Sequence, residues 1–235
     1  MDLFHIHTYR CRHAEDISDE MYVRKAIEVG ADCITFTDHA PFPGNPFRGR
    51  MLFEELPEYL DSINNLKNKY QGRIMVRCGL ETEYLPSFAE YYKELVRGVG
   101  LDLLLLGQYF YEISPGKYSF MYPEQNAYEY QGCMEAIIEG INTGIFYAVA
   151  HPDRSFRRIK HWMPECEGAS MKVITAAQEK GVYLEKNFSS QHHSKHYWKE
   201  FWELIPQDNK VLQGIDAHSI SDIDKYVQKR MGGKI

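Results

Sequence analysis

The chain has 235 residues, a formal charge of -6 and 44% hydrophobic residues, which is enough for one sizeable hydrophobic core. No block of like charges accompanies this acidic balance, so the composition argues against binding to nucleic acid or to an anionic membrane, and a small-molecule partner is expected. Five widely spaced cysteines without a Cys-x-x-Cys pair argue against a disulfide framework and a thiolate zinc site.

The sequence also predicts where the protein works and how it is organised. No apolar run approaches the roughly 18 residues of a membrane span, and the chain opens on an acidic residue and a strand-like segment rather than on a leader. We therefore expect a cytoplasmic protein with a single domain over residues 1–235. The sequence gives no indication of the oligomeric state.

The first predicted element is a strand at the N-terminus that contains His5 and His7. Side chains alternate along a strand, so both rings would point to one face, and two neutral imidazoles on one face begin a divalent-metal site. A polar loop with His13 follows. Ser18 or Asp19 can cap the next helix and Gly30 can end it.

Helices and strands then alternate to the end of the chain. Helical spacing predicts helices at about 18–29, 52–70, 88–96, 124–142, 169–180, 196–205 and 221–229. Short β-rich runs predict strands at 33–37, 74–80, 101–106, 145–150, 182–185 and 211–215. A proline-rich stretch, 41–50, is expected to be an extended loop, and 111–122 a loop or a short hairpin.

Metal-ligand residue types recur where these strands should end: His39, Glu81, His151, Asp216 and His218. Alternating strands and helices indicate an α/β protein with a parallel sheet, whose site lies at the carboxyl ends of the strands. The sheet is either closed as a barrel or open and doubly wound. We favour closure, because a barrel brings together residues from many strand ends.

The ordered set of motifs resembles the PHP family of metal-dependent phosphoesterases over nearly the whole chain. Within that family, the segments Phe36-Thr37-Asp38-His39-Ala40-Pro41 and Gly79-Leu80-Glu81-Thr82-Glu83 are similar to the histidinol-phosphatase branch. The resemblance implies a distorted (β/α)7 barrel, similar to a TIM barrel, with a metal cluster at the carboxyl ends of the strands.

The resemblance also implies which residues bind two to three divalent metal ions. His5, His7, Glu81 and Asp216 would hold the first metal. Glu81 would bridge to a second metal, which His151 also binds, and a third would be held by His13, His39 and His218. A mixed imidazole and carboxylate set suits Zn²⁺, Mn²⁺ or Fe, and neighbouring metals can acidify a shared water and bind phosphate oxygens.

The chain departs from the family at Tyr109, which occupies the position of a histidine that normally binds the second metal. Three alternatives remain open: Tyr109 ligates as a phenolate, it hydrogen-bonds a water on the metal, or the site holds two metals. Asp38 and Asp153 are more typical of residues that orient imidazoles or cap helices than of metal ligands.

Three arginines follow the His151 strand end and can bind the phosphate of a substrate, because a guanidinium offers two parallel donors. We favour Arg157 over Arg154 and Arg158, although all three can also be a solvated basic patch. Members of the histidinol-phosphatase branch tend to carry a further arginine where this chain has Gln191, His192 and His193, which weakens the case for histidinol phosphate.

The resemblance implies hydrolysis of a small phosphate monoester, with histidinol phosphate, which would yield histidinol and phosphate, as the first candidate. Glu81, Asp216 and His218 are the predicted catalytic residues. His218 or Asp216 is the candidate proton donor to the leaving alkoxide. The alternatives are a metal-binding PHP protein with weakened or no catalysis, and a PHP phosphoesterase that acts on another small ester or a nucleotide.

Overall fold

The computed structural model describes residues 1–98 and 100–233. Internal contacts divide the chain into two compact units. Unit 1 comprises Met1–Glu81, Gly98–Leu103 and Gly214–Ile235, and unit 2 comprises Thr82–Arg97 and Leu104–Gln213. A single domain over residues 1–235 stays a prediction.

The predicted alternation of strands and helices is present. Within the described residues one sheet has the strand order β1-β2-β3-β4-β7-β8-β9, and its strands are β1 (Asp2–Ile6), β2 (Cys33–His39), β3 (Met75–Thr82), β4 (Leu103–Leu106), β7 (Ala148–Val149), β8 (Tyr183–Asn187) and β9 (Val211–Gly214). The helices are α1 (Asp19–Glu28), α2 (Leu56–Lys69), α3 (Ala89–Arg97), α4 (Glu129–Thr143), α5 (Pro164–Lys180), α6 (Lys199–Glu203) and α7 (Ile220–Met231). Each described register in this sheet is parallel. An antiparallel hairpin of β5 (Glu112–Ser114) and β6 (Lys117–Tyr118) realises the short hairpin expected in 111–122.

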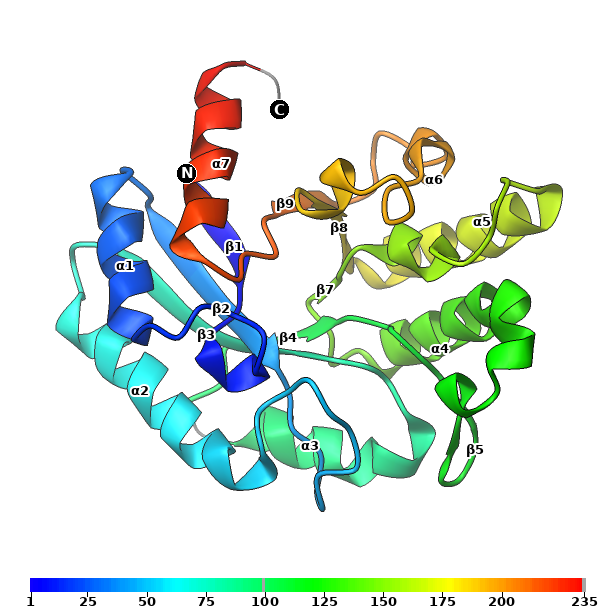
Figure 1. The fold of residues 1–235 in the computed structure, drawn as a ribbon, viewed down its shortest axis with the longest axis horizontal. Helices are drawn as coiled ribbons and strands as arrows, with labels where there is room; N and C mark the ends of the chain where they lie inside the picture. The colour runs from blue at the N-terminus through cyan, green and yellow to red at the C-terminus, as the bar shows by residue number, and fades with distance from the viewer. Residues whose placement is uncertain (99, 234–235) are drawn as a thin grey trace. The chain divides into compact units, whose positions relative to one another are not determined.

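In unit 1, β2 pairs with β1 on one side and with β3 on the other, and all seven of its residues are buried. Figure 1 shows α1 and α2 on the same side of these strands. A strand covered on both faces is apolar along most of its length, as is typical of parallel sheets. Its ionisable residues, Asp38 and His39, lie at the carboxyl end of the strand, where side chains can take part in chemistry.

Gly79 lets β3 pack closely against its neighbours. A Cβ atom at this position would lie 2.9 Å from Cδ1 of Leu103 and 3.0 Å from the carbonyl oxygen of Phe36, closer than side-chain carbons normally approach. The hydroxyl of Tyr59 also donates a hydrogen bond of 2.7 Å to the Gly79 carbonyl. These contacts fix β3 two residues before Glu81.

The segment after β9 runs beside β1 in unit 1. The backbone N–H of Ile215 donates to the carbonyl of Phe4 (2.9 Å), and the N–H of His7 donates to the carbonyl of Ala217 (2.9 Å). Asp216 and the residues that follow are therefore carried past the end of β1. The N-terminus of α7 anchors this segment, because Ser219 accepts a hydrogen bond from the N–H of Asp222 and donates one to its carboxylate.

In unit 2, β7 pairs with β4 and with β8 in parallel register. Helices α4 and α5 pack against each other, as Figure 1 also shows. The loop between β4 and α4 is held at its start by Gln108, whose amide nitrogen donates to the carbonyls of Tyr84 (3.2 Å) and Phe110 (2.6 Å). The residue between these anchors is Tyr109.

Several predicted boundaries were wrong. Strand β7 has two residues instead of six, although the N–H of Tyr147 still donates to the carbonyl of Leu104. Helix α5 begins at Pro164, five residues earlier than predicted, because proline suits the first helical turn. Helix α6 has five residues, since the N–H of its N-cap residue Trp198 is held by Asp153 and the chain does not turn into a helix before it. Strand β3 extends to Thr82, so Glu81 belongs to the strand.

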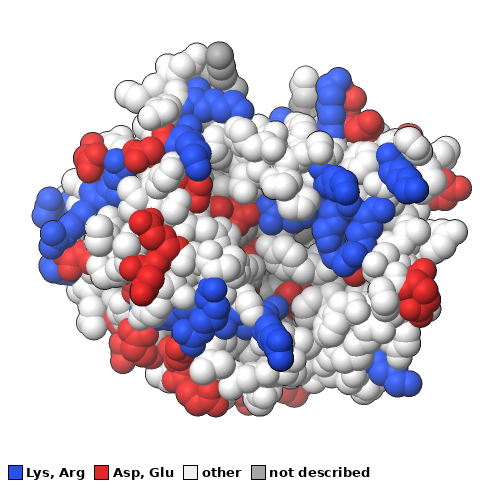
Figure 2. Space-filling model, in the orientation of Figure 1, with Lys and Arg blue, Asp and Glu red and all other residues white. Residues whose placement is uncertain are grey.

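None of the helices in the described part of the chain has both the length and the apolar character that crossing a membrane requires. On the face drawn in Figure 2, basic and acidic side chains are interspersed.

Candidate metal centre

Two histidines face each other at the end of β1. Phe4 pairs with Thr35 and Ile6 pairs with Phe36, so β1 has one extra residue, His5, between these pairs. His5 has a φ of 73°, in the left-handed region that non-glycine residues rarely adopt. Nε2 of His5 lies 3.0 Å from Nε2 of His7. The rings converge as predicted, but through a bulge rather than through simple strand alternation.

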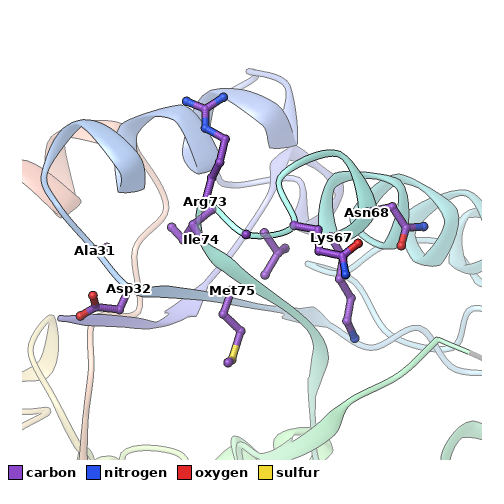
Figure 3. Close-up of a pocket in the computed structure, with 10 residues that line it drawn as sticks. Ala31, Asp32, Lys67, Asn68, Arg73, Ile74 and Met75 are labelled. Carbon is purple, nitrogen blue, oxygen red and sulfur yellow. The ribbon is translucent and has the colours of Figure 1, made fainter.

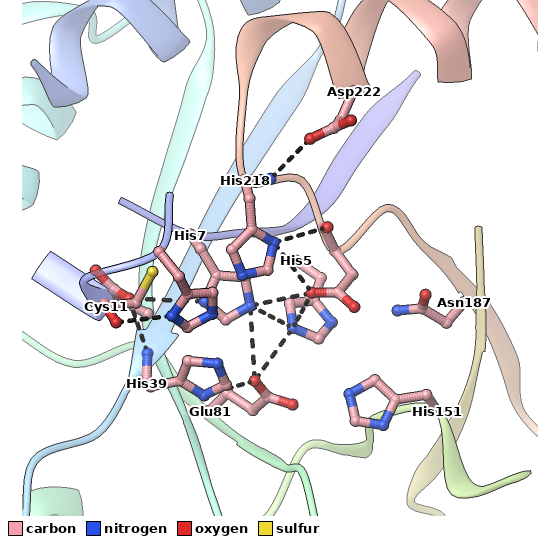
Figure 4. Close-up of polar contacts among 12 residues, drawn as sticks. His5, His7, Cys11, His39, Glu81, His151, Asn187, His218 and Asp222 are labelled. Carbon is pink, nitrogen blue, oxygen red and sulfur yellow. Dashed lines mark hydrogen bonds and ion pairs between the residues drawn. The ribbon is translucent and has the colours of Figure 1, made fainter. Parts of the chain in front are cut away.

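Glu81 and Asp216 bring carboxylates to this pair of imidazoles. Oε2 of Glu81 lies 3.5 Å from Nε2 of His5 and 3.6 Å from Nε2 of His7. Oδ1 of Asp216 lies 3.3 Å from Nε2 of His7. Figure 4 shows Glu81 directed at the histidine rings. The four residues predicted for the first metal therefore converge within unit 1, where each is at most 5% exposed.

A second group in unit 1 consists of His13, His39 and His218, whose ligand atoms lie within 4.8 Å of one another. Nδ1 of His13 lies 2.8 Å from the carbonyl oxygen of Cys11, and Nδ1 of His218 lies 3.2 Å from that of Asp216. A carbonyl only accepts, so both Nδ1 atoms carry the proton and both Nε2 atoms are available to a metal. Nδ1 of His39 lies 3.0 Å from Oε2 of Glu81, which links the two groups.

The donor set fits divalent metal ions. Four ligands on a tetrahedral zinc with bonds of about 2.0–2.1 Å stand roughly 3.3 Å apart, and the contacts between His5, His7, Glu81 and Asp216 are of this size. Nε2 of His218 is buried and has no hydrogen-bond partner among the described residues. Buried polar atoms rarely lack a partner, and a metal ion would supply one here.

The charges of the group follow from burial and from the carboxylates. Burial alone would lower the pKa of His7, but the Asp216 and Asp38 carboxylates outweigh it and raise the pKa of His7 to about 9. Burial, with the neighbouring His7 charge, lowers the pKa of His218 to about 3. At neutral pH His7 thus holds a proton that a metal must displace, whereas His218 is already neutral.

Left-handed backbone recurs at the predicted ligands. Within the described residues, the non-glycine positions with positive φ are His5, Arg12, Asn45, His151 and Asp216. Three of these five are predicted metal ligands. Such conformations cost about 1–3 kcal/mol each and persist where the surroundings over-determine them, which is typical of functional sites.

His151 lies in unit 2 beside Tyr109. The Tyr109 hydroxyl lies 3.0 Å from Nε2 of His151. Nη1 of Arg154 donates to the same hydroxyl over 3.4 Å. Tyr109, the residue at which the chain departs from the family pattern, therefore contacts the predicted metal ligand His151.

A polar shell orients Arg154 and His151 in unit 2. The guanidinium of Arg154 donates to Oγ of Ser190 (2.7 Å) and to Oδ1 of Asn187 (3.3 Å). The carboxylate of Glu185, which is completely buried on β8, accepts from the backbone N–H of His151 (3.1 Å) and from the amide of Asn187 (3.2 Å).

Arg157 and Arg158 have a different partner. Both donate to Oε2 of Glu129, over 2.8 and 2.6 Å, and Arg157 also donates to the carbonyl of Tyr109 (2.8 Å). Glu129 is only 3% exposed, so its carboxylate needs these cations. Arg157 and Arg158 are therefore engaged by Glu129, and which of the three predicted arginines binds phosphate stays a prediction.

The arrangement of motifs and ligand types agrees with a family comparison. A family model described as the PHP domain matches residues 4–189. The chain belongs to the PHP domain family. It is similar to the histidinol-phosphatase of Bacillus subtilis (strain 168), with 25% identity over an alignment 251 positions long. The alignment covers 93% of this chain and 94% of the relative.

Solved structures agree with the fold of this PHP domain. A Listeria monocytogenes protein, described as a candidate histidinol phosphatase, has a TM-score of 0.78 at 19% identity, covering 97% of this chain and 99% of its own. Histidinol phosphate phosphatase from Lactococcus lactis subsp. lactis Il1403, solved with zinc, L-histidinol and phosphate, has a TM-score of 0.74 at 19% identity, covering 97% and 92%. These likenesses concern the fold, and they confirm the predicted (β/α)7 barrel.

Sequence reasoning missed three residues around this PHP site. Cys11, interpreted as a structural thiol, has its Sγ within 4.8 Å of ligand atoms of His7 and His218, and its place two residues before His13 was the available signal. The pairing of Glu129 with two arginines had no local signal. Ser219, three residues before Asp222, carried a helix-capping signal that would have placed the start of α7 correctly.

The pocket drawn in Figure 3 is not part of this site. It has a volume of about 600 Å³ and lies in unit 1, where Asp32 and Met75 mark the amino-terminal ends of β2 and β3. His39 and Glu81 lie at the carboxyl ends of the same strands. The ligand group therefore occupies the end of the strands that parallel α/β proteins use for binding.

Proposed function

We propose that this chain is a metal-dependent phosphomonoesterase that hydrolyses histidinol phosphate to histidinol and phosphate. The convergence of His5, His7, Glu81 and Asp216 in a PHP domain carries the proposal. The similarity to the Bacillus subtilis histidinol-phosphatase over nearly the whole of both chains supports the substrate. The presence of zinc, histidinol and phosphate in the Lactococcus lactis protein supports the cofactor and the product.

The proposed cofactors are two to three divalent ions, Zn²⁺, Mn²⁺ or Fe. His5, His7, Glu81 and Asp216 would hold one ion, and His13, His39 and His218 would hold another. We assign His151 to a further ion. When bound, the metals acidify water and withdraw charge from the phosphoryl oxygens.

The side chains of the protein have separate tasks in this reaction. The guanidinium of Arg154, already oriented by Ser190 and Asn187, binds the charge of the phosphate. Glu81 holds imidazoles of both groups in place through its Oε2 atom. We propose that His218 or Asp216, on the segment before α7, assists proton transfer to the leaving alkoxide.

A panel of phosphate esters tests the substrate. Zinc-loaded and manganese-loaded protein should release phosphate from histidinol phosphate faster than from unrelated small esters or nucleotides, and Glu81→Ala should abolish the release. Arg158→Ala serves as a matched control, because Arg158 is paired with Glu129. Equal rates across the panel would leave a phosphatase of another substrate, whereas full activity of Glu81→Ala would contradict the metal mechanism.

One observation favours the alternative of a metal-binding PHP protein with weakened catalysis. The Tyr109 hydroxyl lies against Nε2 of His151, at the position where the family has a further histidine ligand. Purified protein that holds at most one metal per chain and releases no phosphate with any metal would support this alternative.

The proposed setting is the cytoplasm, which suits the five free cysteines and a small phosphorylated substrate.

A further inference from the structure

A buried arginine lies behind the metal-ligand group of unit 1. Arg10 is 2% exposed, and its guanidinium packs near the rings of Tyr9 (4.5 Å) and Tyr59 (5.5 Å). The two terminal nitrogens donate to both oxygens of Asp19 at 2.9 Å. Nε and Nη2 donate to both oxygens of Glu58, at 2.8 and 2.9 Å.

These contacts leave one guanidinium hydrogen for a different acceptor. An arginine has five N–H donors, of which Asp19 and Glu58 engage four. The fifth, on Nη1, donates to Oγ1 of Thr8 over 3.0 Å. All five N–H donors of Arg10 are thus engaged, four by carboxylate oxygens and one by the Thr8 hydroxyl.

Arg10 determines the direction of the Thr8 hydroxyl. Oγ1 of Thr8 accepts from Nη1 and also, over 3.4 Å, from the backbone N–H of Arg10. Both acceptor positions of the hydroxyl are then occupied, so its single proton must be donated, and the acceptor is Oδ2 of Asp38. Thr8 and Asp38 are completely buried, so bulk solvent does not reach this hydrogen bond.

The Asp38 carboxylate passes this orientation to the metal site. Its Oδ1 accepts from the backbone N–H of His39 over 2.9 Å and lies 3.6 Å from Nδ1 of His7, a charge contact that is longer than a hydrogen bond. A carboxylate opposite Nδ1 favours the tautomer with the proton on Nδ1. Nε2 of His7 is then the atom directed at Glu81 and Asp216.

We propose that Arg10 and Thr8 are positioning residues for the metal ligand His7: the guanidinium orients the Thr8 hydroxyl, the hydroxyl fixes Asp38, and Asp38 holds His7 with Nε2 toward the metal. This inference rests on the proposed role of His7 as a metal ligand. The competing role is purely structural, in which Arg10 only ties α1 to α2 through Asp19 and Glu58.

The sharpest variant removes the Thr8 hydroxyl, which links Arg10 to Asp38. It leaves the contacts of Arg10 with Asp19 and Glu58 in place. Thr8→Val removes the hydroxyl with little change in shape, and Thr8→Ser restores it. Thr37→Val is the matched control, because Thr37 is also completely buried and its hydroxyl has no hydrogen-bond partner among the described residues. Zinc affinity is measured by competition with a chromophoric chelator, and the melting temperature of the metal-free protein is measured in parallel.

Thr8→Val should weaken zinc binding by about 10-fold, the lower end of the usual effect of losing a residue that supports a metal ligand, because Thr8 acts on His7 only through Asp38. Thr8→Ser and Thr37→Val should bind zinc as the wild type does. In zinc-loaded wild type, long-range proton–nitrogen NMR correlations should place the His7 proton on Nδ1. Wild-type zinc affinity in Thr8→Val, or an equal loss in Thr37→Val, overturns the proposal.

Arg10→Lys tests the first residue in this series of contacts. An ammonium has three N–H donors and cannot serve the five acceptor atoms that surround Arg10. It should weaken zinc binding in the same direction as Thr8→Val. The double variant should weaken it less than the sum of the two, because both break one link. A lower melting temperature with unchanged zinc affinity would assign Arg10 the structural role alone. Zinc binding without phosphatase activity would contradict the proposed function and leave this inference standing.

Discussion

The polar groups of the two units differ in what their side chains are arranged to bind. In unit 1, imidazole nitrogens and carboxylate oxygens face one another at 3.0–3.8 Å, an arrangement that a cation would bridge. In unit 2, His151, Tyr109 and Arg154 are joined by hydrogen bonds, and the group includes a cation. We therefore assign the first and third predicted metal ions to unit 1, and the predicted phosphate contact to the unit 2 group, in which His151 is the one imidazole.

The difference also appears in what supports each group. The unit 1 ligands are held by backbone pairing of β1 with the segment after β9 and by the buried network around Arg10. The unit 2 side chains are held by the buried carboxylate of Glu185 and by Asn187 and Ser190. Metal content should therefore depend mainly on unit 1 residues, and substrate affinity mainly on unit 2 residues.

The largest expected effect comes from removing a ligand shared by both groups of unit 1. Glu81→Ala should lose most of the bound metal and lower the turnover number by at least about 10³-fold, because Oε2 contacts His5, His7 and His39. His151→Ala should lose at most one metal per chain. Elemental analysis of both variants, with steady-state kinetics, makes the comparison; an equal loss of metal in the two variants would contradict the contrast between the units.

The next effect concerns the arginines of unit 2. Arg154→Ala should raise the KM for a phosphate ester by roughly 10–100-fold, as expected for the loss of one or two charge-assisted hydrogen bonds. Arg158→Ala should leave KM nearly unchanged, because its side chain is 38% exposed and its partner is Glu129. Inhibition by inorganic phosphate should weaken in parallel with KM. A larger increase in KM for Arg158→Ala than for Arg154→Ala would contradict the assignment of phosphate binding to Arg154.

The two groups also differ in how much of each could be predicted from the sequence. The residues of unit 1 could be predicted because ligand types recur at strand ends in the order that the PHP resemblance implies, and a parallel sheet gathers strand ends at one edge. The bulge at His5 could not be predicted, because the pairing of β1 with β2 creates it. The choice among the arginines depends on Glu129, which lies 28 residues before Arg157 and meets it only through tertiary packing.

Tyr109 sharpens the contrast between the units. Tyr109→His would supply a nitrogen ligand beside His151 and should raise the metal content of the protein. Tyr109→Phe removes one hydroxyl that contacts His151 and Arg154, so it should lower turnover by about fivefold, the usual value of a hydrogen bond, without changing the melting temperature. The measurements are metal stoichiometry, initial rates and thermal melts. Wild-type activity in Tyr109→Phe would mean that another residue completes the site.

A further expected effect is on stability rather than on activity, and it belongs to unit 2 alone. Asp153 is completely buried, and its Oδ2 accepts from the backbone N–H of Trp198 and from the indole of Trp202. Burial raises the pKa of this carboxyl to about 6, against an ordinary value near 3.9. The folded state therefore binds the proton more tightly than the unfolded state does, and this contribution to stability is full below about pH 4.

As the pH rises through about 6, the Asp153 proton and its contribution are lost. The free energy of unfolding should accordingly fall by about 2–3 kcal/mol between pH 4 and 6 from this carboxyl alone. Asp153→Asn cannot ionise and keeps an oxygen to accept from the tryptophans, so it should remove that slope. Denaturant unfolding of metal-free wild type and variant across this range gives the difference between them. An unchanged slope would mean that other groups titrate there and that Asp153 is stabilised as a carboxylate by its two N–H donors.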